Sequence, residues 1–282
     1  MACTKHQFGL TTFFECGQKV FLHPHNMPIL YMACRSRAII PEESFLFRRH
    51  GMYYNGGSDS LYLILLLALM IVSAFASRRV QTVFSKYSGI RASSGIPAEQ
   101  AASDMLRSAG SACRIVPVSG TLTDHFDPRE NTVGLSTGVY GQNSVSALAV
   151  TAHEIGHVLQ YEQDYSPIRL RNAVLPVAGF SSAAAPWIVI GGLFFGSYNL
   201  AMIGVILFGT VLLFQLVTLP VEFNASSRGL SLLEQGGYLS TEQLPMAKEV
   251  LRAAAMTYVF SALASLISFL RLLNIANRSR RN

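Results

Sequence analysis

The chain contains 282 residues, of which 50% are hydrophobic and only 13% are charged. This balance argues against a soluble globular protein and favours an integral membrane protein. The formal net charge is +6, but the basic residues lie beside hydrophobic segments and form no patch with interleaved aromatic side chains, so a nucleic-acid partner is not expected. The 4 cysteines show neither metal-ligand spacing nor a disulfide framework, which indicates a reducing compartment.

Residues 1–51 differ in character from the rest of the chain. They are rich in cysteine, histidine, proline and aromatic residues, and they show no helical or strand periodicity. They also lack the basic and apolar regions that together mark a signal peptide. Because Met52 follows them just before the first hydrophobic segment, we expect residues 1–51 to be a non-native or disordered extension with no role in the fold. Mass spectrometry of the natural N-terminus tests this expectation.

Four segments of the chain are apolar enough and long enough to cross a lipid bilayer. They are residues 57–77, 173–196, 199–219 and 253–273, and a basic tail follows at 274–282. Only Ser197-Tyr198-Asn199 separates the second segment from the third, so we expect a transmembrane hairpin over residues 173–220. Pro176 and Pro186 should kink its first helix. Buried core helices are the alternative for each segment, and this alternative is weakest for the hairpin, which contains no charged side chain.

The positive charges predict the orientation of these spans, because cytoplasmic loops of membrane proteins carry an excess of lysine and arginine. Basic residues follow the first span and precede the second, whereas the turn of the hairpin has none. The residues concerned are Arg78, Arg79, Lys86, Arg91, Arg169 and Arg171. We therefore expect residues 78–172 to face the cytoplasm, and the hairpin to return the chain to that side at Pro220. If the fourth segment also crosses, the basic tail ends on the outer side, against the same rule.

A small mixed unit is predicted between the first span and the hairpin. Pro97 should open a helix that runs to about Arg107. Residues 112–118 and 132–136 each alternate like a short strand, and a turn-rich run at 124–131 lies between them. These strands could offer an edge to an extended peptide, or they could form an ordinary structural hairpin, and the sequence favours neither.

The strongest functional signal is the pentapeptide His153-Glu154-Ile155-Gly156-His157. Asn143 or Ser144 can cap a helix here, apolar residues then recur at helical spacing, and Ser166-Pro167 should close the helix. On that helix the two imidazoles lie one turn apart on the same side and can bind one zinc ion. Glu154 lies about 100° around the helix, where it can face a metal-bound water. The alternative is a pair of core or surface histidines on an amphipathic helix.

A catalytic zinc site of this kind needs a third protein ligand and keeps one position open for water. Gln160 and Gln163 stand where the metzincin pattern has its glycine and third histidine, so the ligand must come from farther along. Glu222 is the best candidate, because Pro220 suits a helix start and places Glu222 and Ser226 on one face of that helix. The expected topology also returns this segment, 221–252, to the side of the histidines. Weaker candidates are Glu162, Asp164, Glu234, Glu242 and Glu249.

Four further segments carry a resemblance to a known family. They are residues 122–128 (LTDHFDP), 152–160 (AHEIGHVLQ), 169–177 (RLRNAVLPV) and 215–226 (QLVTLPVEFNAS). Through them the chain resembles the YugP-type neutral zinc metallopeptidases of bacterial membranes, over roughly residues 57–273. The resemblance implies a multi-pass protein of the cell membrane, whose partners are a polypeptide substrate and the lipid bilayer.

A more distant likeness is to the HtpX-type membrane proteases, which pair His-Glu-x-x-His with Glu-x-x-Ala-Asp after membrane spans. It implies one zinc ion per chain, held by His153, His157 and Glu222, with Glu154 as the general base. The chain departs from that class at Ser226, where the class has aspartate. Ser226 can supply only a neutral partner to a ligand histidine, and Asp124 or Asp127 could take the place of the missing aspartate.

These observations predict a mainly α, α+β integral membrane protein with about four transmembrane helices and a small cytoplasmic zincin-like unit. The expected activity is that of a zinc metalloendopeptidase, in which zinc-activated water hydrolyses peptide bonds of membrane-associated or misfolded polypeptides. A group that stabilises the oxyanion is also needed, and the candidates are His125, Tyr140, Arg228 and Tyr258. The alternative is a non-catalytic, zinc-stapled membrane scaffold or assembly factor, although a closed structural site would need four protein ligands.

Overall fold

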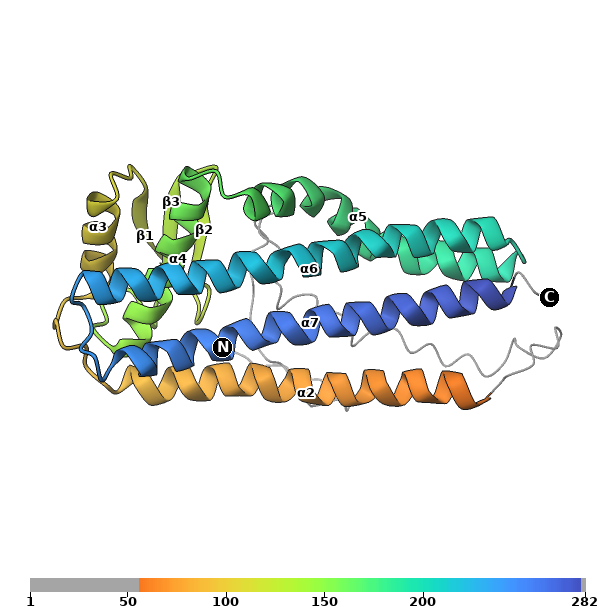
Figure 1. Ribbon diagram of the computed structural model, residues 1–282, viewed down its shortest axis with the longest axis horizontal. Coiled ribbons are helices and arrows are strands. Elements are labelled where there is room, and N and C mark those ends of the chain that lie inside the picture. The colour runs from red at the N-terminus through yellow and green to blue at the C-terminus, as the bar shows by residue number, and fades with distance from the viewer. Residues whose placement is uncertain (1–55, 280–282) are drawn as a thin grey trace, which may run out of the picture. The chain divides into compact units, whose positions relative to one another are not determined.

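The structure is a computed structural model that describes residues 56–279, so the predictions made for residues 1–51, Met52 and the end of the basic tail lie outside the described residues. The described part is mainly helical (Figure 1). Its helices are α2 (Gly56–Ser88), α3 (Ala98–Ser108), α4 (Val145–Glu162), α5 (Ser166–Phe194), α6 (Tyr198–Gln235) and α7 (Leu244–Ser279). Its strands are β1 (Arg114–Val118), β2 (His125–Asp127) and β3 (Thr132–Ser136).

The helices α2, α5, α6 and α7 are long and apolar enough to cross a membrane, as the sequence predicted. All of them are longer than the predicted spans. With 38 residues, α6 is the longest, and at 1.5 Å per residue it extends about 57 Å. The hydrocarbon core of a bilayer is only about 30 Å thick. A large part of α6 therefore lies outside that core.

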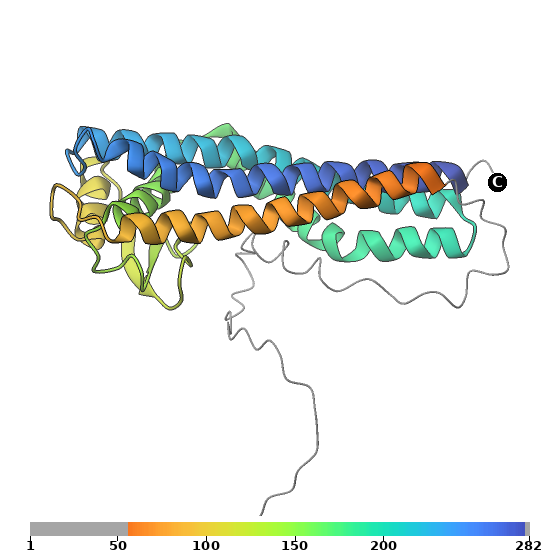
Figure 2. The same ribbon diagram turned by 90° about the horizontal axis from the view of Figure 1, so that it is seen from below.

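The predicted hairpin forms, and α5 and α6 pack along each other on either side of the turn. Ser197 caps α6, because its hydroxyl accepts a hydrogen bond from the Leu200 N–H at 3.4 Å. α5 changes direction along its length (Figure 1), and the expected causes, Pro176 and Pro186, both lie inside it. α6 also packs against α7, and α7 packs against α2 (Figures 1 and 2). The four long helices thus succeed one another in the order α5, α6, α7, α2.

Two predicted helix boundaries are wrong. Pro220 does not begin a helix but lies inside α6, so the expected separate third-ligand helix is the second half of the helix that completes the hairpin. Packing of α6 against its neighbours outweighs the loss of one backbone hydrogen bond at the proline. Ser166 and Pro167 do not close α4, which ends at Glu162. They occupy the start of α5, where a proline is well tolerated.

The small mixed unit contains α3, α4 and a sheet in which β3 lies between β1 and β2. β1 runs parallel to β3, and β2 runs antiparallel to it, with Phe126 opposite Val133. The predictions for α3, β1 and β3 are confirmed. The run predicted as turns contains β2, which is only three residues long and has too few side chains to show a period.

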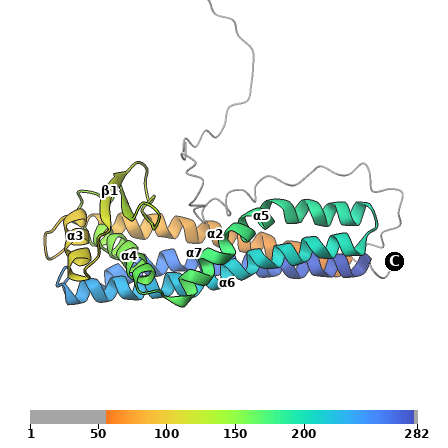
Figure 3. The same ribbon diagram turned by 90° about the horizontal axis from the view of Figure 1, so that it is seen from above.

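The mixed unit shares one hydrophobic core with the ends of the long helices (Figure 3). Leu148 and Ile155 of α4 are fully buried there, together with Phe84 of α2, Leu233 of α6 and Val250 of α7. Ser144 caps α4, as predicted, by accepting a hydrogen bond from the Ala147 N–H at 3.2 Å. The core therefore fixes α4 against α6.

Candidate metal centre

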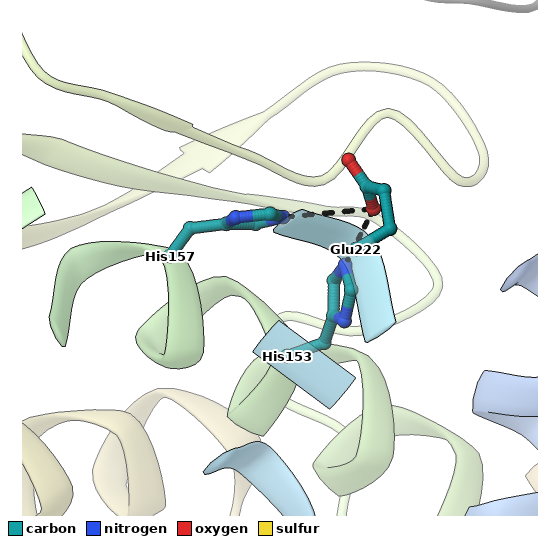
Figure 4. A group of neighbouring side chains, drawn as sticks. All are labelled: His153, His157 and Glu222. Carbon is teal, nitrogen blue, oxygen red and sulfur yellow. Dashed lines mark ion pairs between the residues drawn. The ribbon is translucent and has the colours of Figure 1, made fainter. Parts of the chain in front are cut away.

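Two helices supply the three side chains of the candidate metal centre (Figure 4). His153 and His157 project from the same side of α4, and their rings meet edge to face with centroids 4.7 Å apart. Glu222 projects from α6 toward both rings. Its Oε2 atom lies 3.4 Å from Nε2 of His153 and 3.8 Å from Nε2 of His157. The three ligand atoms all lie within 4.8 Å of one another.

Two glycines allow α4 and α6 to approach closely enough for this arrangement. A Cβ atom on Gly156 would lie 3.0 Å from the carbonyl carbon of Ala225 and closer still to its oxygen. A Cβ atom on Gly229 would lie 2.8 Å from the carbonyl oxygen of Ala152. Real Cβ atoms do not come so near to backbone atoms, so no other residue type fits either position without moving a helix. The glycine within the pentapeptide thus helps to bring Glu222 to the histidines.

Each imidazole is held through its other ring nitrogen. Nδ1 of His153 lies 3.1 Å from the Ser226 hydroxyl, and Nδ1 of His157 lies 3.1 Å from Oε1 of Gln160. An amide oxygen only accepts hydrogen bonds, so Nδ1 of His157 must carry the proton and its Nε2 lone pair is free. Gln160 is fully buried, and its amide nitrogen donates to the Val221 carbonyl at 2.8 Å. Gln160 therefore fixes the tautomer of His157 and ties α4 to α6.

The three side chains fit a zinc ion. Two ligands of one tetrahedral zinc are about 3.3 Å apart, given zinc–ligand distances of about 2.0–2.1 Å, and the distances from Glu222 to the two imidazoles are near this value. Oε2 of Glu222 is buried and has no hydrogen-bond partner among the described residues. A buried carboxylate oxygen without a partner is costly, and a cation between the three residues would satisfy it. Two imidazoles with one carboxylate are a donor set that zinc accepts.

Glu154 is buried beside this set. Burial raises the pKa of Glu154 to about 7, and the negative charges of Asp124 and Glu222 act in the same direction. The positive charge of His153 and a hydrogen bond from the backbone N–H of Phe126 in β2 oppose the rise. A carboxyl with a pKa in this range can both take and give a proton near neutral pH.

Ser226 and Tyr258 both lie beside the side chains of the candidate centre. Tyr258 of α7 is partly exposed and interacts with the Glu222 carboxylate. His125 lies in β2, and its Nδ1 is 2.8 Å from the Thr123 carbonyl oxygen. Of the other two oxyanion candidates, Tyr140 is exposed, and Arg228 donates hydrogen bonds to Asn224 and Gln163.

Three of the five weaker ligand candidates have other partners in the described part of the chain. Glu162 accepts a hydrogen bond from Ser111, Asp164 pairs with Arg169, and Glu249 accepts one from Tyr87. The suggested substitutes for an orienting aspartate are wrong. Asp124 accepts hydrogen bonds from the backbone and hydroxyl of Ser136, and Asp127 accepts one from the Arg129 N–H. Sequence reasoning missed Gln160, although its position three residues after His157 places it on the same side of α4.

Comparisons with known proteins agree with this site. The sequence profile of the family described as "Putative neutral zinc metallopeptidase" matches residues 62–277. The chain is 42% identical over 216 residues to "Putative membrane protease YugP" of Bacillus subtilis (strain 168), which covers 76% of this chain and 96% of that protein. No solved structure matches the chain significantly. The matched region includes all residues of the candidate metal centre, and the chain therefore belongs to the family of putative neutral zinc metallopeptidases.

Proposed function

We propose that the protein is a membrane-embedded zinc endopeptidase in which His153, His157 and Glu222 hold one zinc ion and Glu154 is the general base. The convergence of three ligand atoms from α4 and α6 is the observation that carries this proposal. Three protein ligands suit a catalytic zinc, whereas a structural zinc is usually held by four. Glu154 also has a task only in the catalytic case, because a structural site needs no proton acceptor beside it.

Zinc, when bound, lowers the pKa of a coordinated water and polarises the scissile carbonyl group. Glu154 takes a proton from the attacking water and passes it to the leaving amine. The Phe126 N–H holds the Glu154 carboxylate in place during these transfers. Ser226 and Gln160 keep the two imidazoles turned toward the metal.

Tyr258 is the best-placed donor for the oxyanion of the transition state. It is the oxyanion candidate that interacts with a metal-binding side chain, Glu222, and its environment also includes Glu154. A hydroxyl in this position can donate to the oxygen that gains negative charge as water attacks. His125 is next to Phe126 on the same strand and remains the alternative donor.

The site should open at the cytoplasmic surface of the membrane. From Tyr198, at the hairpin turn, α6 rises about 36 Å to reach Glu222, which slightly exceeds the hydrocarbon thickness of about 30 Å. The basic residues at this end of the spans favour the cytoplasmic side. A site at this depth suits membrane-associated or misfolded polypeptides as substrates.

Replacing Glu154 with glutamine tests the proposal directly. The Glu154→Gln variant should keep its zinc, because the metal ligands are unchanged, and it should lose cleavage of an unfolded protein substrate such as casein. Metal analysis and a gel-based cleavage assay of purified protein measure the two properties. Cleavage at the wild-type rate by this variant would refute the base assignment, and a wild-type protein that binds zinc without cleaving would favour the scaffold alternative.

A further inference from the structure

Arg171 has no task in the proposed mechanism. It lies in the first turns of α5, in one of the four segments that carry the family resemblance. Its neighbour Arg169 is exposed and pairs with Asp164, as expected for a charged residue at a helix start. Arg171 behaves differently, because its side chain packs between helices.

The Arg171 guanidinium lies over the ring of Phe214 in α6, with its central carbon 5.9 Å from the ring centroid. Its Nε atom is buried and has no hydrogen-bond partner among the described residues. None of the ion pairs of residues 56–279 includes Arg171. Stacking on an aromatic ring stabilises the charge, but it leaves the Nε–H in the guanidinium plane without a partner among the described residues. A buried N–H without a partner costs free energy, so an acceptor for this Nε–H is expected, and an anionic one suits the positive charge of the guanidinium.

Arg171 belongs to the same group of interacting side chains as the metal centre. Tyr258 interacts with Glu222 and also has electrostatic interactions with Arg171 and Glu154. Phe214, on which the guanidinium rests, precedes Glu222 by about two helical turns, or about 12 Å along α6. Arg171 therefore lies on the hairpin side of the centre. An extended peptide covers about 3.3 Å per residue, so a group within about four residues of the scissile bond would reach it.

We propose that Arg171 forms a carboxylate-binding subsite of the peptidase, which favours polypeptides with a carboxylate within about four residues of the scissile bond. This inference rests on the proposed function. The carboxylate could belong to an aspartate or glutamate side chain or to the C-terminus of the substrate. A guanidinium binds a carboxylate through two parallel hydrogen bonds, and such a pair would use the Nε–H that has no partner among the described residues. Arg171 is thus a specificity-determining residue, which sequence reasoning had assigned only to membrane orientation.

A lipid phosphate is the competing partner, because α5 begins near the membrane surface. The contact with Phe214 places the guanidinium against α6. Arg169, which is exposed on the same helix, is better placed for lipid head groups. These contacts favour the substrate carboxylate.

Matched quenched-fluorescent peptides test the inference with zinc-loaded protein in neutral detergent. One series places glutamate or glutamine at each position within four residues of the cleaved bond, and every peptide is made with a free and an amidated C-terminus. The wild-type protein should cleave the best carboxylate peptide about tenfold to a hundredfold more efficiently, in kcat/KM, than its uncharged match. The two series show whether a side chain or the C-terminus supplies the carboxylate.

The Arg171→Gln variant should lose this preference, so that its kcat/KM values for a carboxylate peptide and for the uncharged match become equal. The Arg171→Lys variant, which keeps the charge but not the two-pronged geometry, should keep part of it. Arg169→Gln is the matched control and should behave like the wild type. Zinc content of each variant shows that the centre is intact.

Two results in detergent would overturn the inference: equal cleavage of charged and uncharged peptides by the wild type, or a carboxylate preference that persists in Arg171→Gln. The same assays are repeated in phosphatidylglycerol vesicles. If Arg171→Gln loses the preference only in these vesicles, the partner of Arg171 is a lipid phosphate and the inference is also wrong. If the wild type cleaves no peptide at all, the proposed function fails separately. The subsite is then tested by fluorescence anisotropy, with the same peptides labelled and bound to the zinc-loaded Glu154→Gln protein. Equal affinity for the charged and uncharged peptides would again refute it.

Discussion

Replacing Gly156 with alanine should damage the metal centre without touching a ligand. The added Cβ would lie 3.0 Å from the carbonyl carbon of Ala225, and closer still to its oxygen, whereas carbon atoms pack best at about 3.5–4.0 Å. Neither neighbour is a flexible side chain, so α4 and α6 must move apart by roughly 1 Å. Overpacking of this kind typically costs about 1–3 kcal/mol of folding stability.

The effect on zinc binding should be larger than the effect on folding. Separation by roughly 1 Å would lengthen the 3.4 Å distance between Glu222 and His153 far beyond the tolerance of about 0.2 Å in metal–ligand distances. We therefore expect Gly156→Ala to fold but to lose at least about a hundredfold in zinc affinity, which is close to losing one ligand. Competition with a fluorescent zinc chelator measures the affinity, and thermal unfolding measures the stability.

Gly191→Ala is the matched control for this experiment. Gly191 lies inside α5 with no atom within 4 Å of an added Cβ, and alanine is the better helix former, so zinc affinity and stability should not fall. Wild-type zinc affinity in Gly156→Ala would show that the close approach of α4 and α6 is not what places Glu222. The same reasoning predicts a loss of affinity in Gly229→Ala.

Three further predictions concern Gln160, the bound zinc and Cys113. Gln160→Leu should lower zinc affinity about tenfold to a hundredfold because it frees the His157 ring. Chelator competition measures the loss, and wild-type affinity in this variant would remove Gln160 from the centre. Removing zinc with a chelator should lower the unfolding temperature of the wild type, since zinc binds the folded state. The unfolding temperature of Glu222→Ala should not change with the chelator. A chelator effect in that variant would place the third ligand elsewhere. Burial raises the pKa of Cys113 to about 11. Its thiol should therefore resist iodoacetamide at pH 8 in the folded protein and react after denaturation. Mass spectrometry of the peptide that contains Cys113 measures the alkylation, and rapid alkylation of the folded protein would contradict the prediction.

Local signals in the sequence predicted much of the fold. The pentapeptide of α4, the cap at Ser144 and the turn at Ser197 each depend on a few neighbouring residues, and each is present in the structure. Pro220 misled the prediction because a local preference for helix starts was outweighed by packing along the whole of α6. β2 could not be predicted, because its three residues are held by β3 and not by a pattern of their own.

The parts of the site that escaped prediction depend on contacts between distant segments. The Gln160 amide reaches the Val221 carbonyl across a separation of 61 residues. Arg171 meets Phe214 only because the hairpin folds back. Ser226 was expected to be a weak partner, and only the structure shows its hydroxyl beside His153. A single sequence gives the residue types for such contacts but not the pairs.

The shared core has a practical consequence for any attempt to isolate the catalytic unit. Residues 89–165 contain both histidines and Glu154, and in a modular enzyme they could be expressed as a soluble fragment. Here such a fragment would lack Glu222, and its core would lose Phe84, Leu233 and Val250. The long apolar helices therefore supply part of the candidate metal centre and of its core, and biochemical work on this protein has to keep the full set of helices together.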